Sequence, residues 1–147
     1  MPFRYRLEAI LKLQQSIEKQ EENRLLGCAA RVVALRNEIE SWEDERKNRK
    51  CLAAEELKTG STGAAMNLTA EWDVTVRRKQ RELGALLMQA EETRSAQVAK
   101  VRQERQKREV LQGLKERLEG AYDQEELRKV QQVMDDMFLA RAFYYKG

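Results

Sequence analysis

The sequence has no histidine, one proline, two cysteines and few aromatic residues, and each scarcity excludes a class of protein. Without histidine there can be no histidine-based triad, no imidazole general base and no histidine metal site. If Cys28 and Cys51 share a helix they lie ~35 Å apart, too far for a disulfide or a common zinc ion. We therefore expect a protein that is not an enzyme and that uses no cofactor or metal.

Long apolar runs are absent as well. No stretch approaches the ~18–20 apolar residues of a membrane span. The amino-terminal segment MPFRYRLEAILKLQ carries charges throughout and lacks the apolar core of a signal peptide. Two isolated cysteines are typical of a reducing compartment. We expect a cytoplasmic protein that is not an integral membrane protein.

Charged residues are what the chain has in abundance, at 36% of the total, and 28 basic residues nearly balance 25 acidic ones. Together with many Gln, Ala and Leu residues, this usage is typical of long helices and coiled coils. Interspersed charge close to neutrality indicates a solvated, salt-bridged surface and argues against a dedicated nucleic-acid binder. A thin apolar seam between helices is expected in place of a thick core.

The positions of glycine and proline predict two helices. Gly27 is the only glycine between Pro2 and residue 57, and no proline follows residue 67. The segment KTGSTGAA, residues 58–65, is rich in glycine and hydroxyls and predicts a turn. The expected fold class is all-α, an elongated antiparallel two-helix coiled coil, or helical hairpin, whose second helix overhangs the first. We expect one domain, 1–147, with helices over about 3–57 and 68–144 and a turn over about 58–67.

Apolar residues recur at the steps of 3 and 4 residues that define a coiled-coil seam. In the first helix a frame running from Leu25 to Trp42 follows another through Phe3, Leu7, Ile10 and Ile17, which predicts a stutter near Glu21. A fold at about residue 62 makes facing residue numbers sum to ~124 and sets the small run 27–30 opposite small residues of the second helix. These small residues are Ser95, Ala96 and Ala99. The seam of the second helix is expected at Trp72, Val76, Lys79, Leu83, Leu86 and Ala90.

In this register the second helix continues beyond the first. About 25 residues after Tyr122, or ~37 Å of helix, have no companion, yet their apolar stripe continues through Leu127, Val130, Met134 and Met137. An amphipathic helix with nothing to pack on is a candidate partner-binding element. The alternatives are that it frays, folds back or dimerises in crystals.

Basic residues cluster where the two predicted helices approach the turn. In the expected register they form a band around the hairpin that could dock on an acidic protein surface or contact phosphate groups. The alternative, which we favour, is a solvated stretch neutralised by nearby acids, since no aromatic or glycine residues are interleaved for base recognition. The band consists of Arg46, Lys47, Arg49, Lys50, Arg77, Arg78, Lys79 and Arg81.

Both ends of the chain resemble the FliJ family, small coiled-coil proteins of the bacterial flagellar type III export apparatus. The opening FRYRLEAILKL, residues 3–13, is similar to that family's aromatic-basic start followed by Leu-Glu-x-x-Leu. The segment MDDMFLAR, residues 134–141, is similar to its terminal apolar-Asp-Glu-apolar segment followed by arginine. Asp136 stands where glutamate is usual, and Met134 and Met137 stand where leucine is common.

The resemblance implies a central-stalk-like hairpin whose paired termini enter the pore of the hexameric flagellar export ATPase. It further implies contact with the cytoplasmic domain of the export gate, binding of export chaperones, and a peripheral location at the inner membrane. The stalk of virulence injectisomes has the same expected shape. An injectisome stalk and a generic coiled-coil scaffold are therefore kept as alternative functions. The candidate partner-binding residues are Phe3, Tyr5, Leu7, Ile10 and Leu11 at one end, and Leu127, Val130, Met134, Asp135, Asp136, Met137, Phe138 and Arg141 at the other.

Overall fold

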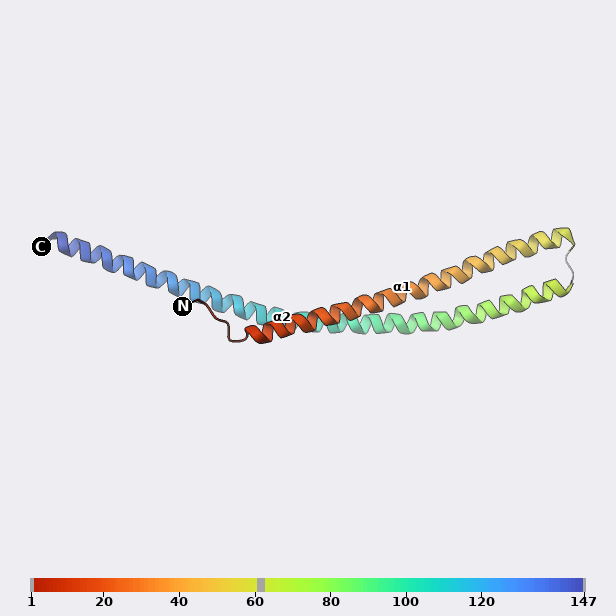
Figure 1. Ribbon diagram of the computed structural model, residues 1–147, viewed down its shortest axis with the longest axis horizontal. Coiled ribbons are helices and arrows are strands. Elements are labelled where there is room, and N and C mark those ends of the chain that lie inside the picture. The colour runs from red at the N-terminus through yellow and green to blue at the C-terminus, as the bar shows by residue number, and fades with distance from the viewer. Residues whose placement is uncertain (1, 61–62, 147) are drawn as a thin grey trace. The chain divides into compact units, whose positions relative to one another are not determined.

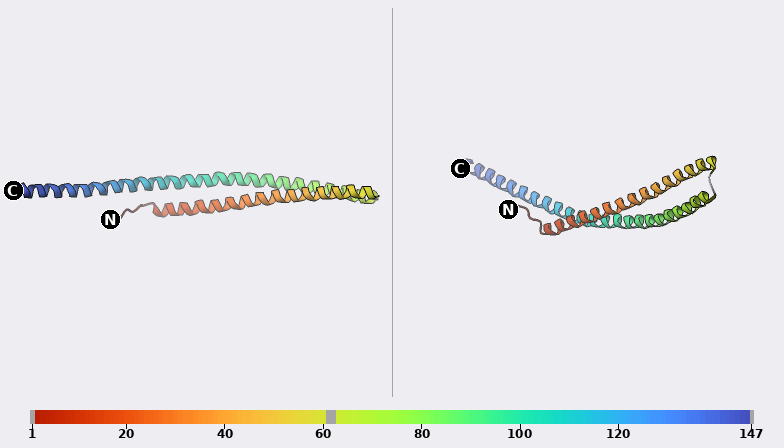
Figure 2. Two further views of the ribbon diagram at one scale, coloured as in Figure 1. Left: turned by 90° about the horizontal axis from the view of Figure 1, so that it is seen from above. Right: turned by 45° about the vertical axis from the view of Figure 1, so that its right-hand side comes forward.

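The computed structural model describes residues 2–60 and 63–146, with side chains through residue 144. In this part of the chain there are two helices and no strand: α1 spans Glu8–Thr59 and α2 spans Gly63–Lys146 (Figure 1). Near the turn the two helices run side by side in opposite directions (Figure 2). The predicted all-α helical hairpin is confirmed.

The helix boundaries differ from the predicted ones. α1 begins at Glu8 and not at about residue 3, because the chain before it forms a turn in which the Glu8 N–H donates to the Tyr5 carbonyl at 3.1 Å. At the other end α1 reaches Thr59, and Gly60 has a φ of 90°, a conformation that glycine adopts without a Cβ clash. α2 begins at Gly63, so the predicted turn over 58–67 is too long; its residues 61 and 62 lie outside the described part.

Contacts divide the chain into two units, which we describe separately. Gln20–Val101 form the turn unit, and Met1–Lys19 with Arg102–Gly147 form the terminal unit. Cross-helix pairs in these units have residue numbers that add up to values between 116, for Tyr5 with Leu111, and 127, for Arg36 with Glu91. These values bracket the ~124 expected from folding the chain at its glycine-rich segment.

The core of the turn unit is a short run of apolar layers. Val32 and Leu35 of α1 are buried with Leu83 and Ala90 of α2, and these four side chains form one cluster. Ile39, Trp42 and Leu87 pack against it and are partly buried. The predicted seam of α1 from Leu25 to Trp42 accordingly lies at or near the interface, since its other members are at least partly buried.

Two predicted seam positions of α2 are wrong. Lys79 and Leu86 are exposed, and the next residue in each case, Gln80 or Leu87, is the partly buried one. The side-chain amide of Gln80 donates to Glu43 Oε2 at 2.9 Å, so this layer of the helix interface is polar. A search for apolar residues at seam spacing cannot detect such a layer.

The predicted close approach of small residues is also wrong. A Cβ placed on Gly27 would find no atom of a neighbour within 4 Å. The small residues expected opposite it, Ser95, Ala96 and Ala99, are exposed. Small side chains at these positions therefore do not draw the two backbones together.

In the terminal unit the seam of α1 passes through Leu11, Gln14 and Glu18. Leu11 is 2% exposed whereas the neighbouring Ile10 is 49% exposed, so the seam keeps steps of 3 and 4 residues and contains no stutter. The stutter near Glu21 predicted from the apolar pattern is wrong because polar residues hold the intervening seam positions.

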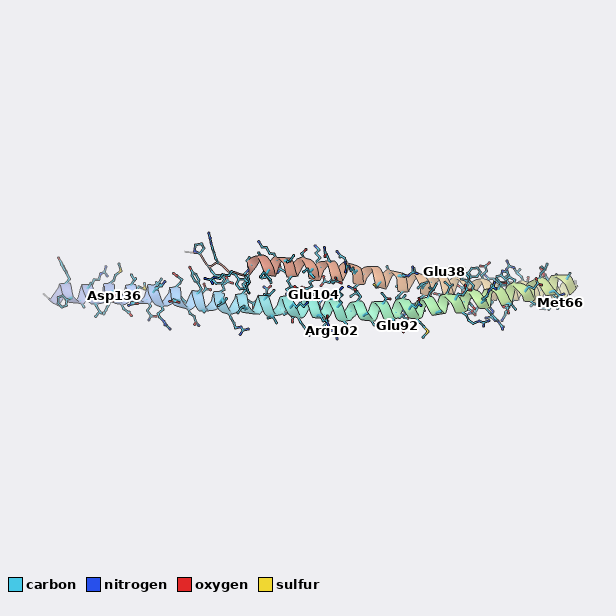
Figure 3. All side chains as sticks on the ribbon, turned by 90° about the horizontal axis from the view of Figure 1, so that it is seen from below. Glu38, Met66, Glu92, Arg102, Glu104 and Asp136 are labelled. Atoms are coloured by element: carbon cyan, nitrogen blue, oxygen red, sulfur yellow. The ribbon has the colours of Figure 1, made fainter. Side chains whose placement is uncertain are left out.

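Those polar seam residues have charged or hydrogen-bonding partners on α2. Gln14 Nε2 donates to Glu104 Oε2 at 2.5 Å (Glu104 is labelled in Figure 3), and Glu18 accepts from Arg105 and Arg108. Burying a carboxylate is costly unless such charge-assisted bonds replace its water. The seam of the terminal unit is therefore held by a larger share of polar contacts than the cluster around Leu83.

Candidate functional site

The carboxyl-terminal part of α2 has no helix beside it. Phe3 of the amino-terminal segment contacts α2 at Tyr122, with its ring centroid 5.6 Å from that of Tyr122. From Asp123 to Tyr144 the side chains are exposed, apart from the half-buried Glu126. Figure 1 shows α2 continuing past α1, and Figure 3 places Asp136 on this unaccompanied part. We call residues 123–144 the tail.

The tail carries an apolar stripe along one face. Met134 and Met137 are each 65% exposed and Phe138 is 74% exposed, and together they form a contiguous apolar patch of the kind that marks interaction sites. A shallow depression lies among these three residues, Ala140 and Arg141. The other predicted tail residues, Leu127, Val130, Asp135 and Asp136, are also exposed, the first two on the stripe and the aspartates on the face away from it.

The amino-terminal candidates have a different environment. Tyr5 and Leu11 are buried, and the Tyr5 hydroxyl donates to the Leu111 carbonyl at 3.0 Å. The Tyr5 hydrogen bond holds the amino-terminal segment on α2, and a partner contact through Tyr5 and Leu11 stays a prediction. Phe3 and Leu7 are half-buried, and Ile10 is the exposed member of the group. The structure thus brings Phe3 to the start of the tail.

Some residues of the basic band make contacts within the hairpin, and only the others are exposed for a partner. Arg46 pairs with Asp73 at 2.9 Å, and Asp73 also pairs with Arg77 at 3.2 Å. The Arg49 guanidinium carbon lies 4.0 Å from the ring centroid of Trp72, a cation–π contact. The remaining members are exposed on both helices: Lys47, Lys50, Arg78, Lys79 and Arg81.

An apolar depression beside the band was not predicted. Leu57 of α1 and Met66 of α2, both about half exposed, line it together with Trp72, and Arg49 and Lys50 stand at its side. Sequence patterns point to one helix at a time, so a surface built from both helices gives little signal. Apolar residues flanking a turn, as Leu57 and Met66 do, are the one clue the sequence contains.

Hydrogen bonds across the hairpin shift the pKa of two carboxylates and one amine. The pKa of Glu21 is lowered by the hydrogen bond from Gln97, with Arg24 and Lys100 adding to the effect and burial opposing it. The pKa of Glu43 is lowered in the same way, chiefly by the hydrogen bond from Gln80. In the terminal unit, Glu8 at 2.9 Å raises the pKa of Lys115.

The described residues contain no group of three or more Cys, Asp or Glu side chains placed to hold a metal ion. Over its described length neither helix has an apolar stretch that could cross a membrane. Comparison of the chain with protein-family models, curated proteins and solved structures finds no match.

Proposed function

We propose that this chain is a non-enzymatic, central-stalk-like component of the bacterial flagellar type III export apparatus. In this proposal the tail enters the ring of the hexameric export ATPase and makes contact through its apolar stripe. The observation that carries the proposal is a continuous helix whose large apolar side chains, Met134, Met137 and Phe138, are left exposed beyond the end of α1. The resemblance of both ends of the chain to the FliJ family supports this choice of partner.

The turn unit carries exposed surfaces of its own and would serve the remaining partners. The export gate's cytoplasmic domain and the export chaperones are proposed to bind here, peripherally at the inner membrane. Exposed Lys47, Lys50 and Arg78 favour an acidic surface on such a partner, and the adjoining depression around Leu57 offers apolar contact. A generic scaffold gives no reason for the exposed stripe.

The stalk of a virulence injectisome is the second candidate, favoured by the same hairpin and tail. The ATPase that is captured discriminates the two, since each stalk would bind the ring of its own system. A nucleic-acid binder would instead act through the basic band, and its binding would weaken steeply with salt.

The test is the double substitution Met134→Ala with Met137→Ala. Anchor side chains commonly contribute ~2 kcal/mol or more to an interface, which corresponds to about a thirtyfold loss of affinity for the ATPase. Because both side chains are exposed, helicity and melting temperature should stay nearly unchanged. Motility should fall in parallel with affinity.

Met88→Ala is the matched control. Met88 also lies on α2 and is 67% exposed, but it belongs to the turn unit. It should leave capture of the ATPase intact. Normal binding by the double variant would rule out the stripe as the contact, and unfolding would show that the tail is part of a core.

A further inference from the structure

Two opposite charges frame the apolar stripe of the tail. Asp123 stands at its start and Arg141 at its end, and both are exposed. Between them Leu127, Val130, Met134 and Met137 follow at steps of 4, 3, 4, 3 and 4 residues, so all six positions belong to one a/d series. Neither charge has an ion-pair partner among the residues that the structure describes.

We infer that the tail is a homodimerisation surface, on which the tail of a second copy of this chain lies antiparallel. In an antiparallel coiled coil each a residue faces a d residue of the other helix. Asp123 of one copy then faces Arg141 of the other, Leu127 faces Met137, and Val130 faces Met134. The two-fold axis repeats each of these layers, so the same patch is complementary to itself.

The charges select this arrangement over its alternatives. A parallel pair would set Asp123 against Asp123 and Arg141 against Arg141, and like charges in contact are unfavourable. An antiparallel pair shifted by one heptad would place Arg141 against Val130 in one direction, or Asp123 against Met134 in the other, so at least one of the two charges would face an apolar residue. Only the unshifted antiparallel pairing satisfies both charges and keeps the apolar layers together.

The residues beside the stripe bring no like charges together in this pairing. In this pairing Val133 approaches its counterpart on one side and Gln131 approaches its counterpart on the other. Glu126, the charged residue closest to the stripe, comes near Ala140. The aspartates at 135 and 136 lie away from the contact, so their charges do not repel across it.

The interface is short, about 27 Å from Asp123 to Arg141, so the dimer should form and dissociate with concentration. It covers the same Met134 and Met137 side chains that the proposed function assigns to the ATPase. A second copy of the chain would then cover the stripe in the free protein, and the ATPase would cover it in the ring. The inference does not depend on the identity of that other partner.

Sedimentation equilibrium of the full chain at low salt, over a wide concentration range, tests the pairing. Wild type should show a monomer–dimer equilibrium. D123R and R141D should each weaken dimerisation by about tenfold or more, because each creates two like-charge contacts. The double variant D123R/R141D should restore the dimer, because the swapped charges still face each other.

D136R is the matched control for D123R, with the same change of net charge on the face of the tail away from the stripe, and it should dimerise like wild type. All three positions are exposed, and circular dichroism verifies that helicity is retained. A wild-type chain that is monomeric at every concentration, or a double variant as weak as the single ones, would overturn the inference. A wild-type chain that dimerises but does not capture the ATPase would count against the proposed function alone.

Discussion

Two adjacent leucines of α2 provide a direct test of how the hairpin is packed. The apolar pattern assigns Leu86 to the seam, whereas the structure leaves it 42% exposed and packs Leu87 against the cluster of Val32, Leu35 and Leu83. Alanine at position 87 should therefore destabilise the protein, and alanine at position 86 should not. The pair is well matched because residue type, helix and distance from the turn are the same.

The magnitudes follow from burial. Removing a fully buried leucine side chain down to alanine loses about 2.4 kcal/mol of transfer free energy at ~0.8 kcal/mol per methylene, and a residual cavity adds to it. Leu83, which is 5% exposed, should approach this value when replaced by alanine, about 2–3 kcal/mol. Leu87 is partly buried and should lose about half as much, and Leu86 less than about 1 kcal/mol.

Urea denaturation followed by circular dichroism measures all three changes, and a constant slope validates the comparison of midpoints. Native-state hydrogen exchange in residues 80–90 would place the destabilisation in the turn unit. Equal losses from Leu86→Ala and Leu87→Ala would refute the packing described above. A larger loss from Leu86→Ala would restore the seam that the apolar pattern predicts.

Two further predictions concern polar contacts of the hairpin. Tyr5→Phe removes the hydroxyl that donates to the Leu111 carbonyl and should lower the free energy of unfolding by about 0.5–1.5 kcal/mol in urea titrations, and Tyr5→Ala should lower it further. If Tyr5→Phe had no effect, the hydroxyl would not hold the segment. Glu21 has a folded-state pKa below its ordinary value of 4.5, so its contribution to stability is present above about pH 4.5 and is lost as pH falls through the lowered pKa. Glu21→Gln should reduce this acid sensitivity in melts between pH 3 and 7, and an unchanged pH profile would contradict the assignment.

Much of the hairpin could be predicted from the sequence because its apolar residues report the seam directly. Leu35, Trp42 and Leu83 stand at the expected steps, and the glycine-rich segment marks the turn. The unaccompanied tail follows from the same information, since a turn near residue 62 leaves α2 longer than α1. Its role as a partner contact stays a prediction.

The remaining errors share a physical cause. Gln14, Glu18 and Gln80 occupy seam positions, and a search for apolar periodicity passes over them and shifts its frame to the nearest hydrophobic residue. The partners that make these polar positions tolerable, such as Arg108 for Glu18, lie far away in the sequence. Only the structure, in which the two helices are packed together, shows that Glu18 forms a layer of their interface.

The start of α1 could not be predicted for a related reason. Nothing in residues 3–7 forbids a helix, so local propensity extends α1 to the amino end. The chain leaves the helical path there because the Tyr5 ring is buried and its hydroxyl reaches the Leu111 carbonyl. A contact across more than a hundred residues thus outweighs the local preference.

The placement of the aromatic residues gives each unit its own optical signal. Both tryptophans, Trp42 and Trp72, belong to the turn unit, whereas Tyr5 and Tyr122, like the two tyrosines at the carboxyl end, belong to the terminal unit. Tryptophan emission therefore follows melting of the unit next to the turn. Tyrosine emission from a chain in which both tryptophans are replaced by phenylalanine would follow the unit that holds the two ends. Loosening of the amino-terminal segment could then be timed separately from opening of the turn, without attaching any dye.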